Sequence, residues 1–227
     1  MTKKSEATRE RILAAAETLV MDRGFSGTSI DEILKEADLS KGAFFHYFKG
    51  KGDLARVLIE THAKKDLALF DDLLEKAEAQ AEDPLEQALH FLAGFEDYVS
   101  RSTDLAPGCM YATYTYEGTQ IEPAIRDFVA DTLRQWTSMY VRKFQEVIDL
   151  YEPALPVTAR QLAETIVSVI EGGLVLQRAY GDIQLTARQS EQFRNYLQLL
   201  FAGSKRKSGK KTTRKSAVPR QAVGEPA

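Results

Sequence analysis

The segment LSKGAFFHYFKGKGDL, residues 39–54, combines aromatic side chains with lysines at a density that needs an explanation. Aromatic residues usually lie inside a protein, whereas lysines stay in water. A single helix can use both if one side packs on a small core and the other faces a phosphate-rich surface. The segment is therefore a candidate for contact with a nucleic acid.

The spacing of the aromatic residues divides this helix into two faces. Phe44 and Phe48 lie four residues apart and are expected to face a core. Ser40 is expected to cap the helix, leaving its first N–H groups free for phosphate. Tyr47 and Lys51 lie near the helix end, within reach of a DNA backbone. The outward face, which fits the major groove of B-DNA, is expected to contain Lys41, Gly42, Phe45 and His46.

Two further helices must position this one. Residues 7–25, ATRERILAAAETLVMDRGF, carry apolar residues at helical spacing and should end at Gly24, a natural left-handed cap. Thr28 or Ser29 can cap the next helix, with Glu32 completing a capping box. Three short helices, the last two joined by a tight turn, describe a helix-turn-helix unit in residues 1–52.

The remainder of the chain also indicates an all-α fold. Helical patterns in residues 53–202 start or stop at prolines, which helices tolerate only in the first turn. No strand-like alternation and no internal repeat is found. We therefore expect a larger helical domain after residue 52, and a disordered, basic tail over residues 203–227.

Charge is distributed unevenly along the 227 residues. The net charge is −3, made up of +1 in residues 1–52, −11 in residues 53–202 and +7 in residues 203–227. The acidic residues 53–202, the body, would repel DNA and leave DNA binding to residues 1–52. The basic tail either adds salt-sensitive attraction to phosphates or is a solvated tail without consequence.

Several classes of protein are disfavoured by composition. A single cysteine excludes an intrachain disulfide and a zinc site built on paired cysteines. No signal peptide and no membrane-spanning run is found, so a cytoplasmic location is expected. The three histidines show no metal spacing, and neither a nucleophile elbow nor a phosphate loop is present. We expect no enzyme activity, no metal and no cofactor.

The segment GFSGTSIDEILKEADLSKGAFFHYFKGKGDL resembles the DNA-binding signature of the TetR/AcrR family of bacterial repressors, over about residues 9–56. The resemblance implies that the third helix enters the major groove and that a long fourth helix leads to a ligand-binding, dimerising body. It also implies that the residues nearest the bases are Lys41, Gly42, Ala43 and His46. The residues that it implies to bind phosphates are Thr28, Tyr47 and Lys51.

Three positions depart from the family pattern. Phe45 stands where the family usually has a tyrosine that donates to phosphate, so this contact should be missing. Asp38 replaces the common turn glycine, and aspartate tolerates left-handed geometry acceptably. Asp31 adds a negative charge where many relatives are neutral or basic.

The body is rich in aromatic side chains, which suit a cavity for a small, largely apolar ligand. Each candidate is more often simply a core residue. The chosen lining residues, most of which combine area with a polar group, are Phe95, Tyr98, Cys109, Tyr111, Tyr114, Trp136 and Tyr140.

Cys109 carries an alternative function. It follows Pro107 and Gly108 near a helix start, a position that lowers a thiol pKa. Some members of the family resembled sense electrophiles or oxidants through such a cysteine. Against this, a free cysteine is often a small buried hydrophobe. A thiol-based repressor therefore stays open, as does a purely architectural DNA-binding protein.

The last two body helices are predicted to form a four-helix dimer interface, with an intramolecular core as the alternative. A two-fold dimer would set two recognition helices about 34 Å apart, so a palindromic operator is expected. The predicted interface residues are Ile166, Val167, Ile170, Gly173, Leu174, Phe193, Tyr196, Leu197 and Leu200.

Overall fold

The computed structural model describes residues 3–101, 108–117, 122–204 and 206–207. Within these ranges the chain is helical and contains no β-strand, as the sequence predicts. The helices are α1 (Lys3–Arg23), α2 (Ile30–Ala37), α3 (Lys41–Tyr47), α4 (Lys51–Gln80), α5 (Pro84–Ser100), α6 (Met110–Tyr116), α7 (Pro123–Leu150), α8 (Ala159–Tyr180) and α9 (Leu185–Phe201).

Local signals fix the ends of the first helices. Gly24 ends α1 with φ +81°, and its N–H donates to the Val20 carbonyl at 2.8 Å. Ser29 caps α2 in a complete capping box with Glu32. Asp38 takes the left-handed conformation at the end of α2, with φ 51°. The sequence predicted all of these features.

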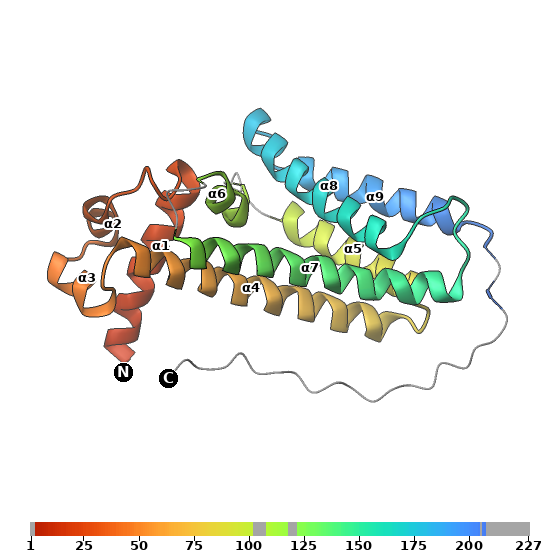
Figure 1. Ribbon diagram of the computed structural model, residues 1–227, viewed down its shortest axis with the longest axis horizontal. Coiled ribbons are helices and arrows are strands. Elements are labelled where there is room, and N and C mark those ends of the chain that lie inside the picture. The colour runs from red at the N-terminus through yellow and green to blue at the C-terminus, as the bar shows by residue number, and fades with distance from the viewer. Residues whose placement is uncertain (1–2, 102–107, 118–121, 205, 208–227) are drawn as a thin grey trace.

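The helices α1, α2 and α3 form a small unit at one end of an elongated molecule (Figure 1). Its core contains Ile12, Ile33 and Phe44, which are at most 1% exposed. The same core continues into Tyr114 of α6 and Val129 of α7. We name α1–α3 the DNA-binding unit for its expected role. It packs on the remainder of the chain through this shared core.

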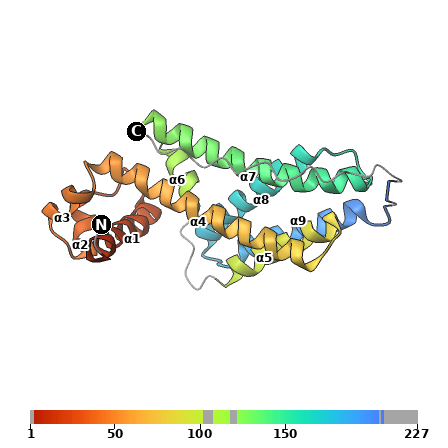
Figure 2. The same ribbon diagram turned by 90° about the horizontal axis from the view of Figure 1, so that it is seen from below.

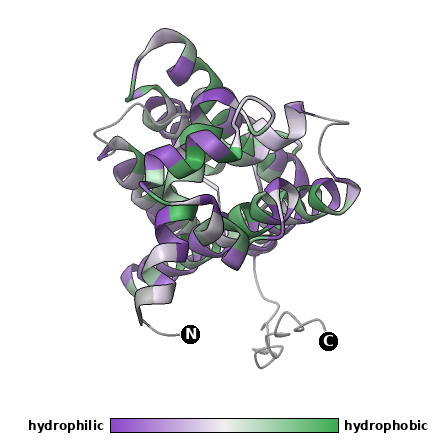
Figure 3. Ribbon diagram, turned by 90° about the vertical axis from the view of Figure 1, so that its left-hand side faces the viewer, coloured by the Kyte–Doolittle hydropathy of each residue, from purple (hydrophilic) through white to green (hydrophobic). Residues whose placement is uncertain are grey.

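The body is a bundle in which α7 packs on α8, α8 on α9, and α5 on both α9 and α4. The helices α4 and α7 run along its length, and α8 and α9 lie together on one side (Figures 1 and 2). Viewed end-on, hydrophobic segments gather toward the middle of the bundle (Figure 3). Its core includes Phe91, Phe144, Ile166 and Leu197.

Two expected boundaries need adjustment. The predicted domain boundary at residue 52 falls inside α4, which runs without a break from the DNA-binding unit into the body. The prediction of disorder from residue 203 is wrong for its first residues, because Ser204 donates to the Glu152 carbonyl at 2.7 Å and Arg206 pairs with Asp83 at 2.8 Å. Residues 208–227 lie outside the described residues.

Candidate nucleic-acid interface and ligand cavity

The two faces of α3 separate as their sequence predicts. Phe44 is fully buried and Phe48 is 1% exposed, and both belong to the core of the DNA-binding unit. Ser40 caps the helix by accepting a hydrogen bond from the Ala43 N–H at 3.4 Å. Ala43 is partly buried, and the outward face contains the exposed residues Lys41, Gly42, Phe45 and His46.

Two lysines at the ends of α3, Lys41 and Lys51, already have partners. Lys41 Nζ lies 2.9 Å from a carboxylate oxygen of Asp31, and both side chains are well exposed. Lys51 Nζ donates to the Ser26 carbonyl at 3.4 Å and lies 4.5 Å from the Phe25 ring centroid. Partial burial lowers the pKa of Lys51. Contact with DNA would therefore exchange existing partners for phosphates or bases.

Tyr47 and Thr28 differ in what they can offer to a phosphate. The Tyr47 hydroxyl shares a 3.1 Å hydrogen bond with Ser5 and lies at a partly exposed position. Thr28 is 1% exposed, and its hydroxyl donates to the Gly24 carbonyl at 2.8 Å. The predicted phosphate contact of Thr28 is therefore wrong for its hydroxyl, which stabilises the α1–α2 turn instead.

A cavity of about 1050 Å³ lies between α1, α4, α5, α6, α7 and α8. Of the predicted ligand-binding residues, Phe95, Tyr98, Cys109, Tyr111, Trp136 and Tyr140 line it. Tyr114 does not, because its hydroxyl donates to the Ala55 carbonyl at 3.1 Å inside the shared core. Aromatic content alone cannot separate a cavity wall from a core position.

The cavity also has polar walls that the sequence analysis missed. His62 lies between two carboxylates, with Nδ1 3.2 Å from Glu17 and Nε2 3.4 Å from Asp66. The Tyr111 hydroxyl donates to Asp66 at 2.9 Å. The signal was the i, i+4 spacing of His62 and Asp66, which places both on one face of α4.

The pKa values of the two carboxyl groups in this cluster shift in opposite directions. The hydrogen bond from His62, assisted by Lys65, lowers the pKa of Glu17 to about 2. Burial raises the pKa of Asp66 above its ordinary value. Only Glu17 is therefore strongly held in its charged form by its neighbours.

Cys109 is the N-cap of α6, where its Sγ accepts a hydrogen bond from the Ala112 N–H at 3.4 Å. Burial, together with the carboxyl of Glu171, raises the pKa of the Cys109 thiol far above its ordinary value. The helix start does not offset this burial. The thiolate that reacts with electrophiles is correspondingly disfavoured.

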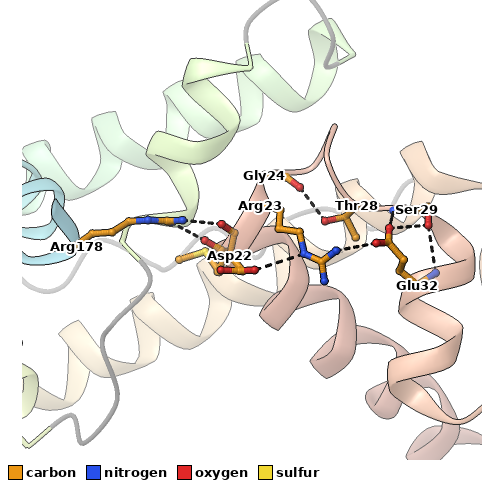
Figure 4. Close-up of polar contacts among 8 residues, drawn as sticks. Asp22, Arg23, Gly24, Thr28, Ser29, Glu32 and Arg178 are labelled. Carbon is orange, nitrogen blue, oxygen red and sulfur yellow. Dashed lines mark hydrogen bonds and ion pairs between the residues drawn. The ribbon is translucent and has the colours of Figure 1, made fainter. Parts of the chain in front are cut away.

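Two contacts join the cavity region to the DNA-binding unit. Arg178 of α8 donates to the carbonyls of Met21 and Asp22, at 2.7 and 2.6 Å, at the end of α1 (Figure 4). Glu117, the C-cap of α6, accepts hydrogen bonds from the Ser26 N–H at 2.9 Å and from the Ser26 hydroxyl at 2.7 Å. Both contacts meet the α1–α2 turn or its edge.

The short turn is itself tied to α2. Arg23 pairs with Glu32 at 2.7 Å, and Glu32 also accepts from Ser29 (Figure 4). A shift of the end of α1 therefore reaches the helix that packs directly on α3.

Most of the predicted dimer residues lie inside the subunit. Five are buried in the chain's own structure, namely Ile166, Gly173, Phe193, Leu197 and Leu200. Three others are partly buried and line the cavity, namely Val167, Ile170 and Leu174. The interface prediction is wrong for the five buried residues, because the most apolar stripe of each helix packs within the subunit, and it stays a prediction for the three partly buried residues.

Tyr196 is 37% exposed and remains a candidate for subunit contact. Other apolar or amphipathic residues of α8 and α9, which the sequence analysis did not choose, are exposed as well. These exposed residues are Val175, Leu176, Tyr180 and Leu199, with exposed fractions of 39–72%.

Neither a metal-binding cluster nor a membrane-spanning helix is found in the described ranges. No group of three or more histidine, cysteine or acidic side chains there is arranged to hold a metal ion. No helix there has the length and apolar character needed to cross a membrane.

Together, a helix-turn-helix unit with an exposed third helix and a helical body with an internal cavity define a class of DNA-binding regulator. Sequence comparison agrees: the family described as "Bacterial regulatory proteins, tetR family" matches residues 12–58. The "Tetracyclin repressor-like, C-terminal domain" matches residues 84–193. The chain belongs to the TetR family of transcriptional regulators.

Individual relatives support this assignment. An uncharacterised HTH-type transcriptional regulator of Lactococcus lactis is 26% identical over 78% of this chain and 87% of its own length. The Escherichia coli HTH-type transcriptional repressor NemR is 37% identical over 34% of this chain and 38% of its own.

Solved structures share the fold. A TetR-family regulator from Agrobacterium tumefaciens has a TM-score of 0.71 at 21% identity, covering 85% of this chain and 98% of its own. The reduced form of E. coli NemR has a TM-score of 0.66 at 20% identity, covering 83% and 96%.

Proposed function

We propose that this chain is a cytoplasmic, non-enzymatic repressor that binds a palindromic operator as a homodimer and is released by a small, largely apolar molecule. The observation that carries the proposal is the division of α3 into a buried aromatic face and an exposed face with Lys41 and His46. Membership of a family of DNA-binding regulators supports it. The repressor role has support from the name of one relative.

In this proposal α3 lies in the major groove. Lys41 and His46 supply donors to base edges, while Gly42 and Ala43 allow the helix to approach closely. The exposed Phe45 supplies apolar contact of the kind that thymine methyl groups accept. The proposed backbone contacts come from the capped end at Ser40 and from Tyr47 and Lys51.

The proposed dimer uses the outer surface of α8 and α9. Val175 and Leu176 on α8 and Tyr196 and Leu199 on α9 are exposed apolar or amphipathic residues on two helices that pack together. Burying them against the same surface of a second subunit would remove apolar area from water and form a four-helix bundle.

We infer that ligand binding is coupled to DNA binding through α6 and Arg178. One end of α6 contributes Cys109, Met110 and Tyr111 to the cavity, and its other end holds Ser26 through Glu117. A ligand that favours one position of α6 would shift the α1–α2 turn. The shift is limited by the ligand's difference in affinity for the two positions.

The thiol-based alternative loses support because burial disfavours the Cys109 thiolate. A purely architectural DNA-binding role leaves the large aromatic cavity without a purpose.

The proposal is tested by selecting duplexes from a random DNA pool with the purified protein. We expect an inverted repeat whose half-site centres lie about one helical turn, or a multiple of it, apart. A selected motif without two-fold symmetry, or recovery of no preferred sequence, would contradict the proposed dimeric operator complex.

A further inference from the structure

The cavity is acidic as well as aromatic. Four carboxylates line it, from Glu17, Asp22, Asp66 and Glu171. The basic side chains of the lining are His62, which lies between two of these carboxylates, and Arg101, which pairs with Asp97 at 2.7 Å. The balance of charge therefore favours a positively charged guest.

Glu171 has the least compensated charge of the four. It lies on α8 in a partly buried position, where burial raises the pKa of its carboxyl and the Cys109 thiol is its hydrogen-bond partner. In the part of the chain that the structure describes, no lysine, arginine or histidine forms an ion pair with it. A carboxylate withdrawn from water without a cation is unfavourable unless something else supplies the charge.

Two residues that line the same cavity carry buried polar atoms without a hydrogen-bond partner among the described residues. Tyr140 is 3% exposed, and its hydroxyl has no hydrogen-bond partner among the described residues. The Trp136 Nε1–H is buried and also unpartnered there. Buried polar groups are nearly always hydrogen-bonded in native proteins, so both can take a partner that the described residues do not supply.

Aromatic rings surround these groups. Phe70 and Phe95 stack at a centroid distance of 6.2 Å, and Trp136 meets Phe70 edge-on at 5.4 Å. Such rings favour a flat apolar body, and their faces also attract a cation.

We propose that the cavity binds a lipophilic cation: an aromatic or polycyclic body with a protonated amine whose charge is received by Glu171, with Asp66 as the second carboxylate. This assignment rests on the proposed role of the cavity as the effector site. The Tyr140 hydroxyl accepts from an amine N–H or donates to a ligand oxygen, and Trp136 donates to a ligand acceptor.

Anionic and neutral ligands fit less well. A carboxylate-bearing ligand would place a negative charge beside four carboxyl groups in a partly desolvated site. A neutral apolar ligand would fill the volume but leave Glu171 withdrawn from water without a cation beside it. A protonated amine offsets the cost of withdrawing Glu171 from water, and its apolar body packs against the same aromatic side chains.

The test uses three compounds with one three-ring body: 9-anthracenylmethylamine, 9-anthracenylmethanol and 9-anthracenecarboxylate. They are titrated into the full-length protein. The chain's single tryptophan lines the cavity, so quenching of Trp136 fluorescence reports binding, with calorimetry as a second readout. We expect the amine to bind at least about tenfold more tightly than the carboxylate, with the alcohol between them.

Glu171→Gln preserves shape and removes the charge. It should weaken binding of the amine by at least about fivefold and change binding of the alcohol by less than about twofold. Glu164→Gln is the matched control, because Glu164 is an exposed carboxylate on the same helix, outside the cavity lining. It should leave binding of all three compounds unchanged.

The outcomes separate the two proposals. Equal binding of amine and alcohol, tighter binding of the carboxylate, or no binding of any of the three would overturn the assignment of a cationic ligand. None of these results depends on DNA, so the regulator proposal would still be judged by the DNA selection alone.

Discussion

At the surface of α2, the Asp31 carboxylate holds Lys41 in an ion pair of 2.9 Å. Both side chains are exposed, so the pair contributes little to stability, but it competes with DNA for the lysine.

We predict that Asp31→Asn strengthens binding to the selected operator by about fivefold, the equivalent of about 1 kcal/mol. Fluorescence anisotropy at two salt concentrations measures the effect. Glu36→Gln removes the same charge from an exposed position on α2 and should have a smaller effect. Equal effects of the two variants would show that the ion pair with Lys41 has no specific role.

The pH dependence of stability tests the buried cluster at Glu17. Its folded-state pKa of about 2 lies below its ordinary value of 4.5, so its hydrogen bonds with His62 and Lys65 stabilise the protein above pH 4.5. This stabilisation is lost as pH falls through the folded pKa.

Urea unfolding of the wild type and of Glu17→Gln, at equal protein concentration, measures this contribution. We expect a difference in the free energy of unfolding of about 1–2 kcal/mol at pH 7, after discounting for partial exposure of Glu17, that shrinks between pH 4.5 and pH 2. Glu10→Gln, an exposed change on α1, should show no such trend. A difference independent of pH would contradict the assigned pKa shift.

Single residues were predictable where local chemistry determines their role. Ser29, Asp38 and Gly24 act through turns and caps that depend on their own backbone and close neighbours. Thr28 was misassigned because the sequence does not show that the Gly24 carbonyl takes its hydroxyl. The partners of Glu17 and Glu171 come from helices distant in sequence and could not be predicted.

At the scale of elements, α6 is the short helix that touches both the cavity and the DNA-binding unit. Its Glu117 accepts two hydrogen bonds from Ser26, including one from the backbone N–H. Hydrogen bonds to a charged acceptor contribute more than neutral ones.

We predict that Glu117→Ala speeds hydrogen exchange of the Ser26 amide by at least about tenfold, since one charged hydrogen bond is lost. Mass spectrometry of peptides covering residues 22–32 measures the rate. Glu75→Ala, an exposed change on α4, is the control. Unchanged exchange at Ser26 would remove α6 from the proposed coupling.

Helix periodicity predicted the α-helical elements but not which neighbour each apolar stripe contacts. The stripe containing Phe193 and Leu197 looks the same whether it packs on α5 or on a second subunit. In the structure it packs inside, and the less apolar stripe with Tyr196 and Leu199 lies outside. The more strongly apolar stripe of α9 therefore marks the core of the subunit and not a contact between subunits.

At the scale of the whole molecule, the account requires a dimer formed through α8 and α9. Leu199 is 72% exposed on the outer surface of α9. Placing a charge there would bury an uncompensated carboxylate at the proposed interface.

We predict that Leu199→Glu converts a wild-type dimer into a monomer at micromolar concentration, as measured by analytical ultracentrifugation. Leu155→Glu is the control, because Leu155 is 59% exposed in the α7–α8 connection. Circular dichroism should show that both variants retain their helices. A monomeric wild type, or a Leu199→Glu variant that stays dimeric, would contradict this interface.

The most direct measurement is the affinity of the Lys41→Ala/His46→Ala double variant for the selected operator, measured by fluorescence anisotropy beside a Lys76→Ala control. Lys76 is an exposed lysine paired with Asp72 near the C-terminal end of α4, whereas α3 immediately precedes the start of that helix. The account predicts a loss of at least about 30-fold for the double variant, since each base contact contributes about 1–3 kcal/mol, and little change for the control. Unchanged operator affinity in the double variant would contradict the claim that the exposed face of α3 reads DNA.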